Sequence, residues 1–288
     1  MSSSFSIAVD SALCIRCGRC VKVCPAQIFT HPDPALPIVV DHVHRCIGCG
    51  HCVDACPKDA VLHSDFPPEK VHRIDYKHLP APEDLMLLMK SRRSNRALTQ
   101  QPIPAEWLSR IVEAAHVAPT ATNAQKVGIT LITDPVLLRA VSDYTISVFS
   151  SLLRIVDFPP IRWILHRTRP DVIRYIPVFK SLRTRHAAGE DPILRHATAL
   201  VLFHTPDGYR FGAEDCNLAY QNCSLMAEAL GVSQIYMGFV LTALKQKGQK
   251  KLCNTLGING HIHALMALGI PEFRFPNYAE RKPLEGNA

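Results

Sequence analysis

The sequence predicts an α+β chain of two domains, a small cysteine-rich one followed by a larger one in which helices outnumber strands. Three observations predict this. Eight of the eleven cysteines fall in two evenly spaced groups near the N-terminus. A stretch with paired prolines, 67–82, has linker composition. After it, apolar residues recur mostly at helical spacing, and the few strand-like runs are separated by long excursions.

Length and composition fit this division. With 288 residues, 47% of them apolar and 20% charged, the chain is expected to form two globular domains. We place them at 1–66 and 83–288, with 67–82 as the linker. No run approaches the roughly eighteen apolar residues of a membrane span, and the N-terminus lacks the layout of a signal peptide. We therefore expect a cytoplasmic protein in a reducing compartment.

The clustered cysteines spell the pattern C-x2-C-x2-C-x3-C-P twice, ending at Cys24-Pro25 and at Cys56-Pro57. This run binds [4Fe-4S] clusters, and its fourth cysteine ligates the other cluster of a pair. Zinc sites also use C-x2-C pairs, but they take two pairs per metal and not triplets with a distant fourth ligand. We expect the first cluster on Cys14, Cys17, Cys20 and Cys56, and the second on Cys24, Cys46, Cys49 and Cys52.

The residues between these cysteines suit cluster binding. Gly18, Gly48 and Gly50 let backbone amides turn toward the sulfurs. His51 lies within the second motif, but four cysteines already complete each cluster, so we interpret it as a solvent-facing loop residue. Short apolar segments at 7–9, 29, 38–40 and 61–62 are typical of small strands. Throughout, this half resembles a bacterial two-cluster ferredoxin.

The second half begins with a helix that has acidic residues Glu83 and Asp84 at its start and Leu85, Leu88 and Met89 on one face. The further expected elements are a helix after Ile103-Pro104, a strand at 127–133, a helix from Asp134-Pro135, a strand at 198–204, a helix at 213–230 capped by Gly231, and a strand at 263–268. No glycine-rich phosphate-binding motif follows any strand, which excludes a Rossmann-type nicotinamide site.

Four segments of this half, in order, resemble motifs of the nitroreductase family of FMN-dependent oxidoreductases, over about residues 83–285. They are Arg92-Arg93-Ser94-Asn95-Arg96, the loop with Pro119, Thr120, Asn123 and Gln125, the segment 231–239, and Arg281-Lys282. The loop has Thr120 where the family motif has serine. Taken alone, Arg92-Arg93 could be a solvated helix end favoured by the helix dipole. Guanidinium groups and a hydroxyl donor are suited to binding a phosphate. Basic residues from both ends of one domain can converge on one such dianion.

The resemblance implies the following roles. The FMN phosphate and ribityl chain would be bound by Arg92, Arg93, Ser94, Arg96, Arg281 and Lys282, with Thr120, Asn123 and Gln125 beside the isoalloxazine. The backbone of Met237 and Gly238 would face flavin N5, and no side chain is assigned as catalytic. The family builds this site at the interface of an intertwined homodimer, so a homodimer is implied.

The stretch 144–196 departs from the family pattern and holds nine Lys/Arg against four Asp/Glu, with interleaved aromatic residues. It lacks a clear counterpart of the side chains that some relatives direct at the flavin's pyrimidine edge. Three interpretations stay open: a helical excursion with a solvated basic face, a lid that recognises an anionic or aromatic substrate, and a membrane-surface or quinone-access helix.

Several other reactive residues are assigned no chemistry. Cys216 and Cys223 are spaced to share one helix face and, with Cys253, are expected to be small core residues. Three histidines lack partner spacing and receive no catalytic role: His116, His186 and His196.

Together the halves predict an oxidoreductase that passes single electrons from an external donor through two [4Fe-4S] clusters to FMN. The donor would be a low-potential one such as ferredoxin, in place of NAD(P)H. The substrate would be a small electron-poor molecule, a nitroaromatic, quinone or enone. The alternatives are an electron-transfer module serving a protein partner and a flavin-binding regulator or storage protein. The net charge of +7 does not require nucleic acid, since the clusters and a phosphate-bearing cofactor subtract charge.

Overall fold

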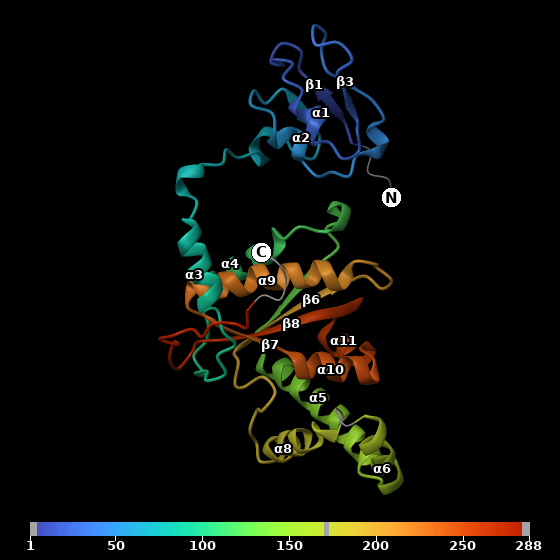
Figure 1. Cartoon of the computed structure of the whole chain (residues 1–288), viewed down its shortest axis with the longest axis vertical. Helices are drawn as coiled ribbons and strands as arrows, with labels where there is room; N and C mark the ends of the chain where they lie inside the picture. The colour runs from blue at the N-terminus through green and yellow to red at the C-terminus, as the bar shows by residue number, and fades with distance from the viewer. Residues whose placement is uncertain (1–4, 170–172, 284–288) are drawn as a thin grey trace. The chain divides into compact units, whose positions relative to one another are not determined.

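The computed structural model describes residues 5–169 and 173–283. Its chain divides into two compact units, one of Met1–Pro80 with Thr120–Ala124, the other of Ala81–Pro119 with Gln125–Ala288. Figure 1 shows the secondary structure of both units. The loop Thr120–Ala124 is the one segment that the sequence assigned to the second domain and the structure groups with the first.

The first unit holds two small antiparallel sheets. Strand β1 (Ile7–Val9) pairs with β4 (Val61–His63), and β2 (Phe29–Thr30) pairs with β3 (Val39–Val40). The helical segments are α1 (Arg19–Val23), η1 (Val43–Arg45), α2 (His51–Asp54), η2 (Pro68–Lys70) and η3 (Tyr76–His78). A small core that includes Ile28, Phe29 and Val53 fills the space between them. These are the strands that the apolar segments predict.

The second unit is built on one antiparallel sheet of strand order β5-β6-β8-β7. Its strands are β5 (Gly128–Ile132), β6 (Ala199–Thr205), β7 (Ser233–Tyr236) and β8 (His261–Gly269). Its helices are α3 (Pro82–Ser91), α4 (Ala105–His116), α5 (Pro135–Val156), α6 (Pro159–Thr168), α8 (Ile176–Ala187), α9 (Gly212–Leu230), α10 (Gly238–Lys247) and α11 (Lys250–Leu256). The short helical turn η4 (Ala121–Asn123) belongs to the loop that clusters with the first unit.

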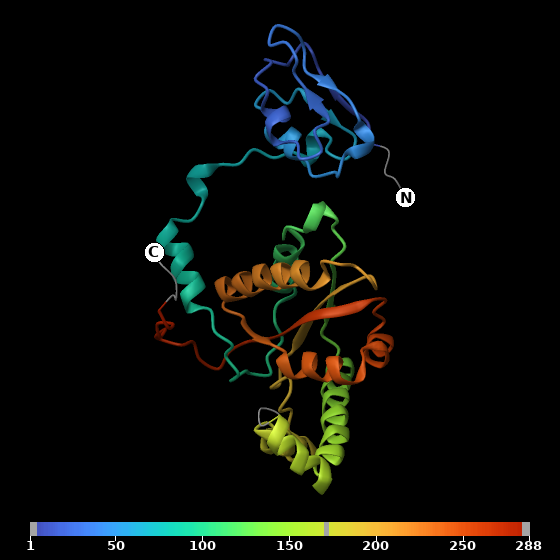
Figure 2. The ribbon, with the colours of Figure 1, turned by 45° about the vertical axis from the view of Figure 1, so that its right-hand side comes forward.

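Helices cover both faces of this sheet. Helices α4 and α9 lie on one face, and α5, α10 and α11 lie on the other, as the two views in Figures 1 and 2 show. Alternate residues of β6 enter the two cores: Leu200 and Leu202 pack with α5 and α10, whereas Val201 and Phe203 pack with α4 and α9. The α+β fold predicted from the sequence is confirmed.

Local signals place most of these elements. Gly231 ends α9 in the left-handed conformation, at φ 76°, and its N–H bonds to the Glu228 carbonyl, as predicted. Cys216 and Cys223 are buried in the α4–α9 core and Cys253 in the other, which confirms their assignment as core residues. Burial raises the pKa of the Cys216 and Cys223 thiols to about 12.

Two elements differ from expectation. The segment 231–239 resembles a glycine-containing loop of the family, but four of its residues form β7, an edge strand that pairs with β8. Helix α3 packs against α9 but buries none of its residues in this chain, so Leu85 and Met89 stay exposed. Helix α5 is long and apolar enough to cross a membrane, yet 50% of that apolar window is buried inside the structure, as in a core helix.

Candidate functional site

The first candidate site is the pair of cysteine motifs in the first unit. The four cysteines predicted for the second cluster, Cys24, Cys46, Cys49 and Cys52, line one small hollow together with His51 and His63. Burial raises the pKa of Cys20, Cys46 and Cys52, and the charges of neighbouring cysteines add to it: Cys24 for Cys46 and Cys52, and Cys14 and Cys17 for Cys20. This proximity fits the expected exchange of the fourth ligand between motifs.

Backbone donors and burial complete this environment. Gly48 N–H donates to Cys46 Sγ at 3.3 Å, and Ala60 N–H donates to Cys56 Sγ at 3.2 Å. Burial is the largest influence on the pKa of Cys52, which it raises to about 12, because a thiolate loses its hydration there. Binding to iron removes the proton and supplies the missing positive charge. The site therefore suits a metal cluster better than free thiols.

A single metal ion and a [4Fe-4S] cluster need different arrangements of their ligands. Among residues 5–169 and 173–283, no three Cys, His, Asp or Glu side chains converge on one point as the ligands of one metal ion would. In a [4Fe-4S] cube the four thiolates are spread over a cluster of four irons, so they surround a space and do not converge on one atom. Cys24, Cys46, Cys49 and Cys52 line one hollow, as the ligands of one cluster would.

The second candidate site is a cavity of about 480 Å³ in the second unit, at the start of α10. Three of the predicted cofactor-binding residues meet there: Arg96, Met237 and Gly238. Aromatic side chains form much of its wall: Tyr175 just before α8, Phe179 on α8, Tyr236 at the end of β7 and Phe239 on α10. Phe179 stacks on the buried Phe149, with ring centroids 4.3 Å apart, so this wall is anchored in the core.

The backbone at the start of α10 separates the two residues predicted to face N5. Met237 N–H already donates to the Leu265 carbonyl at 3.1 Å. Gly238 is the first residue of α10, where N–H groups lack partners within the helix. A Cβ at Gly238 would meet no atom within 4 Å, so the space beside it is open. Of the pair, Gly238 therefore offers a backbone donor to a ligand.

Arg195 lines the same cavity and was not singled out from the sequence. Its backbone is in the left-handed region, at φ 59°, which is uncommon for a residue with a side chain. Burial lowers the pKa of its guanidinium, and the charges of Arg185 and Arg96 lower it further. Within the described part of the chain, neither Arg195 nor Arg96 forms an ion pair. Two cations in one cavity favour an anionic or electron-rich ligand.

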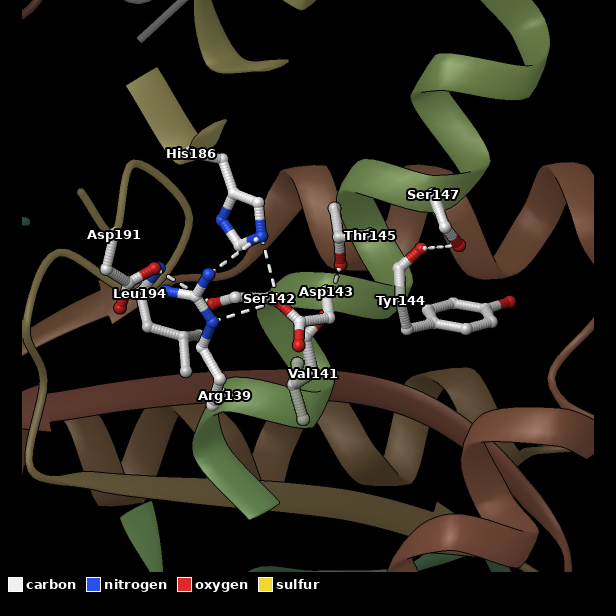
Figure 3. A network of polar contacts seen from close by, with 10 residues as sticks. All are labelled: Arg139, Val141, Ser142, Asp143, Tyr144, Thr145, Ser147, His186, Asp191 and Leu194. Carbon is white, nitrogen blue, oxygen red and sulfur yellow. Dashed lines mark hydrogen bonds and ion pairs between the residues drawn. The ribbon is translucent and has the colours of Figure 1, made fainter. Parts of the chain in front are cut away.

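Asp191 fixes the loop that carries Arg195. Its carboxylate accepts hydrogen bonds from the Ser142 hydroxyl at 2.8 Å and from the backbone N–H groups of Leu194 at 3.0 Å and His196 at 3.4 Å. Figure 3 shows Ser142, on α5, beside this carboxylate. The Arg195 N–H bonds to the Asp191 carbonyl as well. Arg195 and His196 both have positive φ. The sequence does not indicate this, because neither arginine nor histidine is a residue type that usually adopts it.

His186 contributes to structure beside this loop. Its Nε2 lies 2.8 Å from a carboxylate oxygen of Asp143, which also pairs with Arg139 one turn earlier on α5. Figure 3 shows the three side chains together. The contact ties α8 to α5, away from the cavity lining.

The remaining predicted cofactor residues lie elsewhere. Arg93 lines a different cavity of about 440 Å³, with Asn95 and Arg274, and donates to the Ala279 carbonyl at 3.3 Å. Arg281 and Lys282 follow that carbonyl and are exposed. The N-terminal part of the domain therefore meets its C-terminal segment at Arg93. Arg92 and Ser94 line neither of the two cavities.

The loop with Thr120, Asn123 and Gln125 does not line the 480 Å³ cavity. Within the first unit, the Asn123 amide donates to the carbonyls of Ile47 at 3.3 Å and Gly48 at 2.7 Å. Thr122, Asn123 and Gln125 all have positive φ, a concentration of strained backbone that is typical of functional loops. Their role beside a flavin stays a prediction.

Known proteins resemble both parts of the chain. The profile of the nitroreductase family matches residues 89–270, and that of the 4Fe-4S dicluster domain matches residues 13–61. A nitroreductase with bound FMN from Bacteroides fragilis has a TM-score of 0.55 at 20% identity, covering 71% of this chain and 98% of that one. A nitroreductase with bound FMN from Desulfitobacterium hafniense has a TM-score of 0.53 at 17% identity, with the same coverage.

A curated relative is also similar in sequence. A protein of Thermus thermophilus named NADH dehydrogenase is 27% identical over 200 residues, which are 67% of this chain and 89% of that protein. The two profiles occur in the order that the cysteine motifs and the later basic motifs predict, with the dicluster domain first. Because the family profile covers well over half of its length, the chain belongs to the nitroreductase family, with a 4Fe-4S dicluster domain preceding the nitroreductase domain.

Proposed function

We propose that this protein passes single electrons from a low-potential donor through its two [4Fe-4S] clusters to FMN, which reduces a small electron-poor substrate. The observation that carries the proposal is the cavity at the start of α10, where Arg96 and Arg195 lie between aromatic walls in a nitroreductase fold and form no ion pair with any described residue. Such a cavity suits a planar aromatic group with electron-rich edges. The dicluster domain that precedes the nitroreductase domain would supply this cavity with single electrons.

FMN is the flavin that this cavity would hold. The two solved nitroreductases described above were crystallised with FMN. In this chain, Arg96 and the Gly238 N–H lie at the cavity, and Arg93 lies beside the C-terminal segment that leads to Arg281-Lys282. When bound, FMN can accept electrons one at a time and deliver a hydride. The residues of this chain would orient the ring and exclude water from it.

The wall of Tyr175, Phe179 and Arg195 belongs to the basic, aromatic stretch at 144–196. The placement of these three residues at the cavity supports the interpretation of that stretch as a lid that contacts substrate. Exposed Phe158 and Trp163 lie on the same stretch but do not line the cavity. We therefore propose nitroaromatic, quinone or enone substrates that enter beside Arg195.

The electron donor could be either ferredoxin or NAD(P)H, and the proposal favours ferredoxin. The dicluster domain supports ferredoxin, whereas the Thermus thermophilus relative bears the name NADH dehydrogenase. The test is anaerobic purification followed by parallel addition of reduced ferredoxin, NADH or NADPH, with flavin absorbance as the readout. We expect bleaching by ferredoxin. Rapid bleaching by NADH alone would contradict a ferredoxin donor and leave the flavin reaction intact.

Substrate turnover tests the enzymatic part. Removal of FMN should abolish product formation, and reconstitution should restore it. Turnover that is indifferent to FMN would refute the proposal. The second candidate is an electron-transfer module, supported by the same dicluster domain. If FMN is reduced through the clusters but no nitroaromatic, quinone or enone is turned over under anaerobic conditions, this second candidate holds.

We further propose that the protein is a cytoplasmic homodimer. Helix α3 buries none of its residues within one chain, and four apolar side chains on it are exposed: Leu85, Met86, Leu87 and Met89. A second copy would cover such a face. Sedimentation or light scattering of the purified holoprotein tests this, and a monomer at micromolar concentration would contradict it.

A further inference from the structure

His63 is an aromatic side chain held firmly beside the second cysteine motif. It is the last residue of β4 and is only 5% exposed. Phe5 and Phe66 pack against it, with ring centroids 5.2 Å and 4.9 Å from that of the imidazole. The imidazole also lines the hollow formed by Cys24, Cys46, Cys49 and Cys52. Its orientation is therefore fixed by packing on both sides.

The hydrogen bonds of His63 define which nitrogen carries its proton. The backbone N–H of Asp65 donates to Nδ1 at 3.1 Å, so Nδ1 is an acceptor. The proton of the neutral ring then lies on Nε2. This nitrogen is 3.5 Å from Cys46 Sγ, a distance suited to an N–H···S hydrogen bond because sulfur is larger than oxygen. Cys46 Sγ thus accepts from both His63 and the Gly48 N–H.

The first motif has a histidine at the matching position without this contact. His31 follows Cys24-Pro25 at the same spacing at which His63 follows Cys56-Pro57. The His31 Nε2 lies 3.1 Å from the Leu36 carbonyl and not beside a sulfur. The repeated sequence therefore has two equivalent histidines, of which only His63 reaches a cluster ligand in the described chain.

We propose that His63 raises the reduction potential of the cluster bound by Cys24, Cys46, Cys49 and Cys52, through its N–H···S hydrogen bond to Cys46. One-electron reduction adds negative charge to a cluster and its thiolates, and a hydrogen-bond donor to sulfur stabilises that charge. His63 acts through Cys46 and touches no substrate. The consequence is that the two clusters differ in potential, and an incoming electron resides preferentially on the cluster beside His63.

The test is an EPR-monitored redox titration of the full-length protein with both clusters in place. His63→Phe keeps an aromatic ring between Phe5 and Phe66 but removes the donor. We expect a negative shift in the midpoint potential of one cluster and no shift in the other. His31→Phe is the matched control, because it removes the equivalent histidine, and it should leave both potentials unchanged. Equal shifts in both variants, or none in His63→Phe, would overturn the proposal.

A second measurement can overturn the proposal on the wild-type protein alone, and two variants serve as its controls. In protein whose histidine rings carry ¹⁵N, the reduced cluster should show a ¹⁵N hyperfine coupling by pulsed EPR, transmitted through the hydrogen bond. His31→Phe should retain that coupling, and His63→Gln should lose it while its amide N–H partly preserves the potential. The absence of any ¹⁵N coupling in the wild-type protein would overturn the proposal. Neither readout depends on substrate turnover, so the outcome is independent of the proposed enzymatic function.

Discussion

The hydroxyl of Ser142 on α5 donates a 2.8 Å hydrogen bond to the carboxylate of Asp191, 49 positions later in the chain. The same carboxylate caps the backbone N–H groups of Leu194 and His196, on either side of Arg195. One acidic side chain thereby connects a core helix to the loop that carries a cavity-lining cation. The position of Arg195 depends on this connection, because its left-handed backbone is unfavourable without support.

Asp191→Ala should therefore destabilise the second unit and displace Arg195. Hydrogen bonds to a charged acceptor contribute about 1.5–3 kcal/mol each, and Asp191 is partly solvated, so we expect a total loss of about 1–3 kcal/mol. Denaturant unfolding of the holoprotein measures it. Ser142→Ala removes only one of the donors and should cost about 1 kcal/mol. An unchanged unfolding midpoint in Asp191→Ala would show that the loop holds its shape without the carboxylate.

Arg195→Gln should reduce selectivity for substrates that carry negative charge. We expect a rise of about tenfold in KM for 4-nitrobenzoate, which is about 1.4 kcal/mol, and little change for 4-nitrobenzamide. Arg195→Lys keeps the charge and should lose less. Steady-state kinetics at matched FMN occupancy gives the comparison. If both substrates are affected equally, or if FMN binding falls, Arg195 contacts the flavin or maintains the fold and does not select substrate.

Cys24→Ser should disturb the cluster of the second motif although Cys24 belongs to the first. The fourth cysteine ligates the partner cluster, and the hollow around Cys24 and Cys46 supports that assignment. Iron content should fall from about eight to about four per chain. Cys46→Ser should remove the same EPR signal as Cys24→Ser, whereas Cys20→Ser should remove the other. Loss of the same signal in Cys20→Ser and Cys24→Ser would contradict the exchange of ligands.

The buried thiols of Cys216 and Cys223 should resist alkylation and make stability sensitive to high pH. Burial raises the pKa of each to about 12 from an ordinary value of 9.0. The folded protein therefore holds these protons longer than the unfolded chain does. Their contribution to stability is complete below pH 9 and decreases as the pH rises from about 9 to 12. Unfolding midpoints of the wild type and of Cys216→Ala across that range measure the effect.

Iodoacetamide labelling at pH 8 provides the complementary readout. With clusters intact we expect negligible labelling, and denaturation after cluster removal should expose all eleven cysteines. Labelling of Cys216 or Cys223 in the native protein would show that the α4–α9 core opens.

The sequence by itself determined the features that depend on local spacing. Two C-x2-C-x2-C-x3-C-P runs predict the dicluster domain, because a cubane takes cysteines at short fixed intervals, and the profile at residues 13–61 confirms that domain. Helical periodicity and the cap at Gly231 predict α9, since both operate within a few turns. Cys216 and Cys223 were assignable to the core for the same reason. The order of the basic and glycine-containing segments sufficed for the resemblance to the nitroreductase family.

The tertiary structure alone decided which of these residues meet. Strand β7 exists because β8 provides hydrogen-bond partners, which no periodicity within 233–236 announces. Arg93 and Arg96 lie three positions apart in one motif, yet they line different cavities. His31 and His63 occupy equivalent positions in the repeat, yet only His63 contacts a cysteine. Such contacts join residues distant in sequence, and they follow from how strands and helices pack, which local spacing does not encode.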